Sequence, residues 1–247
     1  RGATHAVLGG IGAAEAAGIG IRASGEVFGS PFFDNNSARA VAQIGVWMTQ
    51  AEQLGSDGLM LATGIYRSDL TSQAAIDAEL KYVRRVLDQA ADRAADLGLA
   101  LSVENSSDFS TSELEGLLDS LEGRCELFLD VANPLNISEN PVTVVEELGR
   151  FATAGHVKDV IRTSVWNFDR AHRYGYGVEF AYPGEGSVFS PELISAITRI
   201  ADGREFALGI EGLNSRVGVD DQFEKLNKSL AFLRSAFADS EIAEVVR

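Results

Sequence analysis

Residues 99–134 read LALSVENSSDFSTSELEGLLDSLEGRCELFLDVANP, in which two mostly apolar runs flank a helical stretch. The first run, LALSVE, ends at Glu104, and the second, CELFLDV, contains Asp130 near its end. The segment between them, residues 111–121, has its apolar residues at helical spacing. An apolar strand, a helix and another apolar strand in this order are typical of a right-handed β–α–β crossover in a parallel sheet.

The same alternation continues in both directions along the chain. Helices are expected where apolar residues recur at helical spacing, at 37–54, 72–97, 140–151, 191–203 and 220–237. Gly55 and Gly98 follow the first two, as expected at helix C-termini. Strands are expected near residues 20, 60, 102, 128, 154, 179 and 208. No linker or low-complexity tract interrupts the pattern, so we expect one α/β domain over residues 1–247.

Charged residues close several of the apolar runs at regular intervals. Glu104 and Asp130 are 26 residues apart, as are Asp130 and His156, and Glu211 follows 55 residues later. The longer interval predicts a further strand in between, and residues 177–181 (GVEFA) suit it. In a (β/α)8 TIM barrel the carboxyl ends of all strands meet at one face, where active sites are built. Seven strands are visible, so we expect the first strand and helix of such a barrel to precede Arg1.

An open dinucleotide-binding sheet is the alternative α/β architecture. It requires a glycine-rich turn directly after the first strand. The only comparable segment, residues 9–18 (GGIGAAEAAG), precedes a strand, and small-residue helix packing explains it better.

The four side chains at the strand ends form a mixed nitrogen and oxygen donor set. Glu104, Asp130, His156 and Glu211 suit a hard divalent cation better than a thiolate-binding one. Buried carboxylates are costly without a partner, and a cation removes that cost. The sequence therefore predicts one bound divalent cation, with Mn²⁺ expected and Mg²⁺ or Co²⁺ as alternatives.

Net charge, the length of the apolar runs and the cysteine count limit the kinds of partner and location that we expect for the chain. The formal net charge of −15 and the pI near 4.6 disfavour nucleic acid and anionic membrane surfaces. No run approaches the ~18 consecutive apolar residues of a membrane helix. The single cysteine, Cys125, excludes an internal disulfide and is expected to be buried. A cytoplasmic location is expected, and a secreted protein without disulfides fits the same cysteine usage.

Several short motifs also resemble a known family. They are LSVEN (101–105), FLDVANP (128–134), GHVKD (155–159), PGEG (183–186) and GIEG (209–212). Their order over residues 18–237 is similar to that of the xylose isomerase-like TIM barrel superfamily, the sugar phosphate isomerase/epimerase proteins, which include ketose 3-epimerases, hydroxypyruvate isomerases and inosose dehydratases. The resemblance implies one cation held by Glu104, Asp130, His156 and Glu211, a small carbohydrate substrate and a possible homo-oligomer.

The resemblance also implies a reaction. In the epimerases of this family the two glutamates, here Glu104 and Glu211, move protons on opposite faces of the sugar. The chemistry is proton transfer at a carbon next to a carbonyl, through an enediolate that a metal stabilises. Lys158 is expected either to contact a substrate oxygen or phosphate or to pair with Asp159, which lies beside it at the rim. Asp159 is itself a candidate for substrate binding.

The chain departs from the family pattern at specific positions. Asn133 stands where isomerases and epimerases of this group usually carry a histidine, so substrate contacts there are expected to differ. Residues 160–182 form a longer connection than in compact epimerases, and its Trp166 and Arg173 are candidates for substrate binding; packing on a neighbouring subunit is the alternative. The zinc endonucleases of the same superfamily need several more histidines than His5, His156 and His172.

Two other functions remain compatible with the same residues. A metal-dependent lyase or dehydratase acting on an oxidised (keto) sugar or glycoside would begin with the same proton abstraction. A non-catalytic barrel that binds a sugar or a partner would keep the fold without the chemistry.

Overall fold

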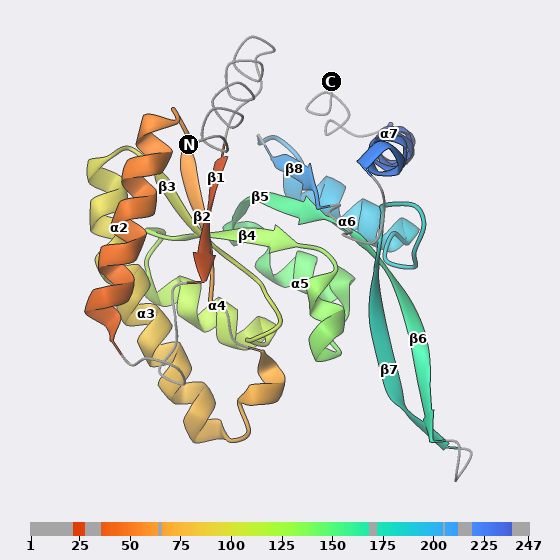
Figure 1. Cartoon of the computed structure of the whole chain (residues 1–247), viewed down its shortest axis with the longest axis horizontal. Helices are drawn as coiled ribbons and strands as arrows, with labels where there is room; N and C mark the ends of the chain where they lie inside the picture. The colour runs from red at the N-terminus through yellow and green to blue at the C-terminus, as the bar shows by residue number, and fades with distance from the viewer. Residues whose placement is uncertain are drawn as a thin grey trace. The chain divides into compact units, whose positions relative to one another are not determined.

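The computed structural model describes residues 22–27, 36–63, 66–167, 172–204, 206–211 and 219–238. The glycine-rich segment 9–18 lies outside these residues. The chain divides into two compact units, Arg1–Glu126 and Leu127–Arg247. Each unit is described by itself; Figure 1 labels their elements.

The first unit contains three consecutive parallel strands and the helices that connect them. The strands β1 (Arg22–Val27), β2 (Gly58–Ala62) and β3 (Ala100–Glu104) pair in chain order. The described part of β1 begins at Arg22, where the sequence predicts a strand near residue 20, and the residues before Arg22 lie outside the described part of the structure. The helices are α2 (Ser37–Gln53), α3 (Gln73–Asp96) and α4 (Thr111–Ser120), with a short 3₁₀ turn η1 (Arg67–Asp69). This is the β–α repeat that the sequence predicts.

The helix boundaries of this unit follow from capping. The Asn36 side chain accepts a hydrogen bond from the backbone N–H of Arg39 at the start of α2, and Ser72 caps α3 in the same way. Both helices end before a glycine in the left-handed region, Gly55 with φ 67° and Gly98 with φ 68°. The glycines that the sequence singled out therefore terminate the helices, as expected.

The second unit contains three further parallel strands. The strands β4 (Glu126–Asp130), β5 (Ala152–Val157) and β8 (Ala207–Ile210) pair in this order. The remaining elements are η2 (Asn133–Ile137), α5 (Pro141–Leu148), η3 (Gly149–Phe151), α6 (Pro191–Ala201) and α7 (Val219–Ala236). In this unit α5 and α6 pack against each other.

One expected strand has a different role. Residues 177–181 belong to β7 (His172–Ala181), which pairs antiparallel with β6 (Asp159–Asn167), while β5 pairs directly with β8. The prediction of a parallel barrel strand at this position is wrong. Parallel strands need a long crossover, usually a helix, whereas antiparallel strands join through a short turn. The described residues between β5 and residue 177, which are 158–167 and 172–176, contain no helix, and β6 and β7 form the projecting hairpin of Figure 1 instead.

Burial agrees with the apolar pattern of the sequence. Cys125 is 2% exposed, as expected, and burial raises the pKa of its thiol to about 12.

Among the helices that the structure describes, none is both long enough and apolar enough to cross a bilayer.

Candidate metal centre

Parallel pairing brings three of the predicted ligands of the second unit to one end of the sheet. Asp130 is the last residue of β4 and lies opposite His156 of β5, which in turn lies opposite Gly209 of β8. Glu211 follows β8 directly, and its backbone N–H donates to the Val157 carbonyl at 3.2 Å. Asp130, His156 and Glu211 each offer a ligand atom, and these atoms lie within 4.8 Å of one another.

Asp130 is fully buried and rigidly held. Its Oδ1 accepts hydrogen bonds from the backbone N–H groups of Ala132 (2.8 Å) and Asn133 (2.7 Å), where the chain turns into η2. Its Oδ2 lies 2.9 Å from Nζ of Lys158. One carboxylate oxygen is thus fixed by backbone, and the other faces a positive charge.

His156 is oriented by an aromatic neighbour. Its ring packs edge-on against Phe128 with the ring centroids 4.7 Å apart, and its Nδ1 lies 3.7 Å from Oε2 of Glu211. Phe128 precedes Asp130 by two residues on β4, so the two side chains share one face of the strand. The strand that supplies a carboxylate also supports the imidazole.

Lys158 links the two carboxylates. Its Nζ lies 2.9 Å from Asp130 Oδ2 and 2.6 Å from Glu211 Oε2. Burial alone would lower the pKa of Lys158, but the negative charges of Asp130 and Glu211 outweigh it and raise that pKa. Burial would likewise raise the pKa of Glu211, whereas the hydrogen bond and charge of Lys158 keep it below its ordinary value. Both groups are therefore charged at neutral pH, and the two carboxylates hold the Lys158 ammonium group between them.

Lys158 pairs with Asp130 and Glu211 rather than with Asp159, whose carboxylate accepts backbone N–H groups instead. It lies in the short connection between β5 and β6. Contact with a substrate oxygen or phosphate, the other role expected from the sequence, stays a prediction.

Asp159 is the first residue of β6 and binds the backbone of the loop that follows β7. It is 1% exposed, and its two oxygens accept N–H groups from Val160, Gly184, Gly186 and Val188 at 2.8–3.1 Å. All of these donors are backbone, and three of them belong to the loop that includes PGEG. We therefore propose that Asp159 stabilises this loop and does not contact the substrate.

The other predicted substrate-binding residues differ in their position in the fold. Asn133 is 7% exposed and begins η2 directly beside Asp130. Trp166 lies on β6 and Arg173 on β7, paired with each other in the ladder, and their side chains lie outside the described part of the structure.

Glu104, the fourth predicted ligand, belongs to the first unit. It ends β3, and its Oε2 accepts a hydrogen bond from Ser106 Oγ at 3.4 Å. Nearby, Asp108 is completely buried and bonded to the Thr63 hydroxyl and the Phe109 N–H. Burial raises the pKa of Asp108 to about 6, and the charge of Glu104 adds to this rise.

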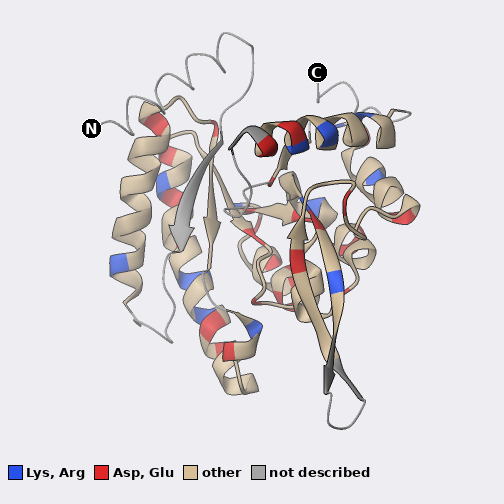
Figure 2. Cartoon of the chain, turned by 45° about the vertical axis from the view of Figure 1, so that its right-hand side comes forward, with Lys and Arg blue, Asp and Glu red and all other residues tan. Residues whose placement is uncertain are grey.

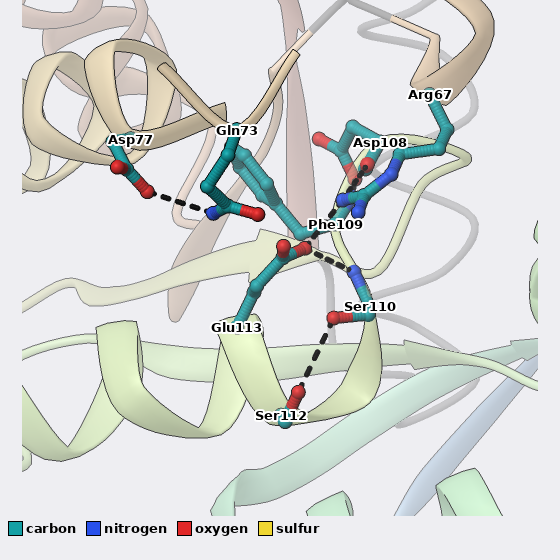
Figure 3. Close-up of polar contacts among 8 residues, drawn as sticks. All are labelled: Arg67, Gln73, Asp77, Asp108, Phe109, Ser110, Ser112 and Glu113. Atoms are coloured by element: carbon teal, nitrogen blue, oxygen red, sulfur yellow. Dashed lines mark hydrogen bonds and ion pairs between the residues drawn. The ribbon is translucent and has the colours of Figure 1, made fainter. Parts of the chain in front are cut away.

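The loop after β3 is held by a capping arrangement that the sequence analysis did not identify. The Glu113 carboxylate accepts the Ser110 backbone N–H at 2.8 Å and lies 2.5 Å from a guanidinium nitrogen of Arg67, as Figure 3 shows. Serine followed three residues later by glutamate is the sequence signal of this capping box. The arrangement fixes the segment that directly follows Glu104.

The parallel β–α repeats define an α/β protein of the TIM-barrel type, and the acidic and histidine side chains at the strand ends form a possible metal site. The chain belongs to the xylose isomerase-like TIM barrel family, whose family model matches residues 13–236. A search of curated proteins finds no match.

Solved structures share the fold at low sequence identity. D-psicose 3-epimerase from Clostridium cellulolyticum H10 is 13% identical with a TM-score of 0.65, covering 93% of this chain and 83% of that one. The probable 3-DHS dehydratase AsbF from Bacillus anthracis is 14% identical (TM-score 0.63; 91% and 80% covered). A xylose isomerase-like TIM barrel protein from Mycobacterium smegmatis in complex with magnesium is 15% identical (TM-score 0.60; 90% and 76% covered). At these identities the likeness concerns the fold alone.

Proposed function

We propose that this chain is a divalent-metal-dependent sugar isomerase or epimerase that transfers a proton at the carbon next to a carbonyl. The observation that carries the proposal is the cluster of Asp130, His156 and Glu211 at the carboxyl ends of adjacent parallel strands, with Lys158 among them. The epimerase among the solved structures of the same fold supports the reaction class.

The donor set fits a divalent cation. Two carboxylates and one imidazole converge, and the Lys158 ammonium group already contacts both carboxylates, so this position favours positive charge. Asp130, His156 and Glu211 would hold the ion in the second unit, and we propose Glu104 as the fourth ligand, with Mn²⁺ the expected ion. When bound, the cation would supply Lewis-acid stabilisation to the negative charge that develops on the substrate oxygens.

The protein groups have separable roles in this proposal. Glu211 has a 42% exposed side chain and a lowered pKa, so it is ionised and accessible and acts as the base on one face of the sugar. Glu104 serves the opposite face. Asp130, with 0% exposure and two backbone hydrogen bonds, holds its position and moves no proton.

The test combines metal binding with isotope exchange. Purified protein is titrated with MnCl₂ by isothermal calorimetry, and exchange of carbon-bound protons of D-fructose and other ketoses in deuterated water is followed by NMR. We expect one Mn²⁺ per chain and ketose exchange that falls at least 100-fold in Glu211→Gln, because a positioned base contributes about 10²–10⁴-fold. Glu185→Gln is the matched control, since Glu185 is an exposed glutamate of the same unit paired with Lys225.

Two results would overturn the proposal. One is absence of exchange with every ketose at saturating Mn²⁺; the other is exchange in Glu211→Gln equal to that of the unsubstituted protein. Absence of metal binding as well would favour a non-catalytic sugar- or partner-binding barrel.

A lyase or dehydratase acting on a keto sugar or glycoside is the second candidate. The likeness to a probable dehydratase supports it, because elimination begins with the same proton removal. Exchange or proton loss accompanied by a dehydrated product, detected by mass spectrometry, would distinguish it from isomerisation.

A further inference from the structure

The second unit contains a pocket that none of the predicted ligands lines. Its volume is about 660 Å³, and its walls come from the end of η2, the first turns of α5 and α6, and the β6–β7 hairpin. This volume lies within the usual range for small-molecule sites. In Figure 2 the described part of the β6–β7 hairpin is mostly tan, with isolated red and blue segments.

Tyr176 gives the pocket a fixed aromatic wall. Its hydroxyl donates to the Leu135 carbonyl at 2.7 Å and lies 2.9 Å from Ser138 Oγ, yet the residue remains 41% exposed. The polar tip is thus anchored to η2 while much of the ring stays accessible. An exposed, anchored ring can pack on the C–H face of a sugar with little further loss of conformational freedom.

The pocket begins close to the metal centre. The backbone N–H of Asn133 lies 2.7 Å from Asp130 Oδ1, and Leu135, two residues further along η2, is the pocket residue that binds the Tyr176 hydroxyl. Two residues of 3₁₀-helix advance about 4 Å. The pocket wall therefore begins two residues along η2 from a backbone group that binds the buried ligand, which suits a substrate with one additional ring.

The lining chemistry selects the class of occupant. Ser138 and Thr143 provide hydroxyls, Arg162 provides donors, and Glu139 and Glu192 provide acceptors. Two carboxylates against one guanidinium disfavour an anion such as a phosphate, and the many polar groups disfavour an apolar tail. Mixed donors and acceptors beside one aromatic ring match a neutral polyhydroxylated ring.

We propose that this pocket is a second sugar subsite, which takes a neutral hexose unit attached to the sugar that reacts at the metal centre. The proposal rests on the proposed function for the reacting end and names the substrate class as a keto-disaccharide or related glycoside. It also gives the β6–β7 hairpin a role, because the hairpin contributes Tyr176 and Arg162 to the subsite.

The test compares ligands that share the ketose end. D-fructose is compared with isomaltulose and maltulose, which are fructose bearing a glucosyl group at O6 or O4. Affinity is measured by calorimetry on the Mn²⁺-loaded protein, and proton exchange is measured in parallel. We expect at least one disaccharide to bind about tenfold more tightly than fructose, and Tyr176→Ala and Thr143→Trp to abolish this advantage without changing fructose affinity. Phe223→Ala, at a 64% exposed aromatic of α7, is the control and should retain it.

The outcomes separate the two proposals. Neither disaccharide binding better than fructose, or an advantage that survives in both Tyr176→Ala and Thr143→Trp, would overturn the subsite even if fructose exchange is robust. Conversely, a Tyr176-dependent preference for a disaccharide with no proton exchange on any substrate would support the subsite and refute the proposed function.

Discussion

Replacing Asp159 by asparagine should destabilise the second unit by about 2–4 kcal/mol. The carboxylate receives two N–H groups on each oxygen: Val160 and Val188 on Oδ1, and Gly184 and Gly186 on Oδ2. Asparagine keeps one oxygen and directs an NH₂ group at the other pair of donors. Two N–H groups would lose their acceptor, and the predicted total takes about 1–2 kcal/mol for each, the lower part of the range of about 1–3 kcal/mol for an unsatisfied buried group.

Local packing prevents the loop from moving to new acceptors for these N–H groups. A Cβ atom built on Gly186 would overlap Asp159 Oδ1 and the Val160 carbonyl oxygen, so the loop lies directly against the carboxylate. The loop cannot draw closer, and Asp159 is 1% exposed, which leaves little access for water to replace the lost acceptor.

Urea denaturation at pH 7, followed by circular dichroism, provides the measurement. With an m-value of about 2–3 kcal/mol/M, the midpoint of Asp159→Asn should fall by about 1–2 M. Glu185→Gln makes the same chemical change on an exposed side chain of the same loop and should change stability by less than about 0.5 kcal/mol. A change below about 0.5 kcal/mol in Asp159→Asn itself would refute the reasoning.

Two further substitutions test the structure. A Cβ at Gly155 would overlap the backbone carbonyl oxygen of Leu129, so Gly155→Ala should lower the free energy of unfolding by about 1–3 kcal/mol or more in urea denaturation. Gly209→Ala on the neighbouring strand is the control, because a Cβ there meets other atoms only at 3.7 Å or beyond and should cost less. Equal costs would contradict the strand spacing. Asp108→Asn should keep the hydrogen bond to Thr63 and remove a titrating group. Burial raises the pKa of Asp108 from 3.8 to about 6, so the protonated carboxyl group stabilises the fold below pH 4. Up to about 3 kcal/mol of that stabilisation is lost as the pH rises through 6. The stability difference between variant and parent should therefore shift in favour of the variant between pH 4 and 7, and parallel pH profiles would contradict this.

Much of the fold and part of the site could be predicted from local patterns. Apolar runs, helical spacing and terminal glycines set the strands and helices, and the family resemblance drawn from LSVEN, FLDVANP and GHVKD agrees with the family that the chain matches. Equal spacing of strand ends was sufficient to select Asp130 and His156, because successive β–α units place their carboxyl ends at the same edge.

The sequence alone determined which segments form helices and strands. The tertiary structure decided which strands pair with each other and which side chains contact each other. Residues 177–181 have a strand pattern, but nothing local states whether their partner is a parallel neighbour or the preceding strand β6. Lys158 could have paired with the adjacent Asp159, yet its partners are Asp130 and Glu211, which are 28 and 53 residues away in the sequence. Contacts of this kind depend on register and loop closure, and these are set by the assembled sheet rather than by any short segment.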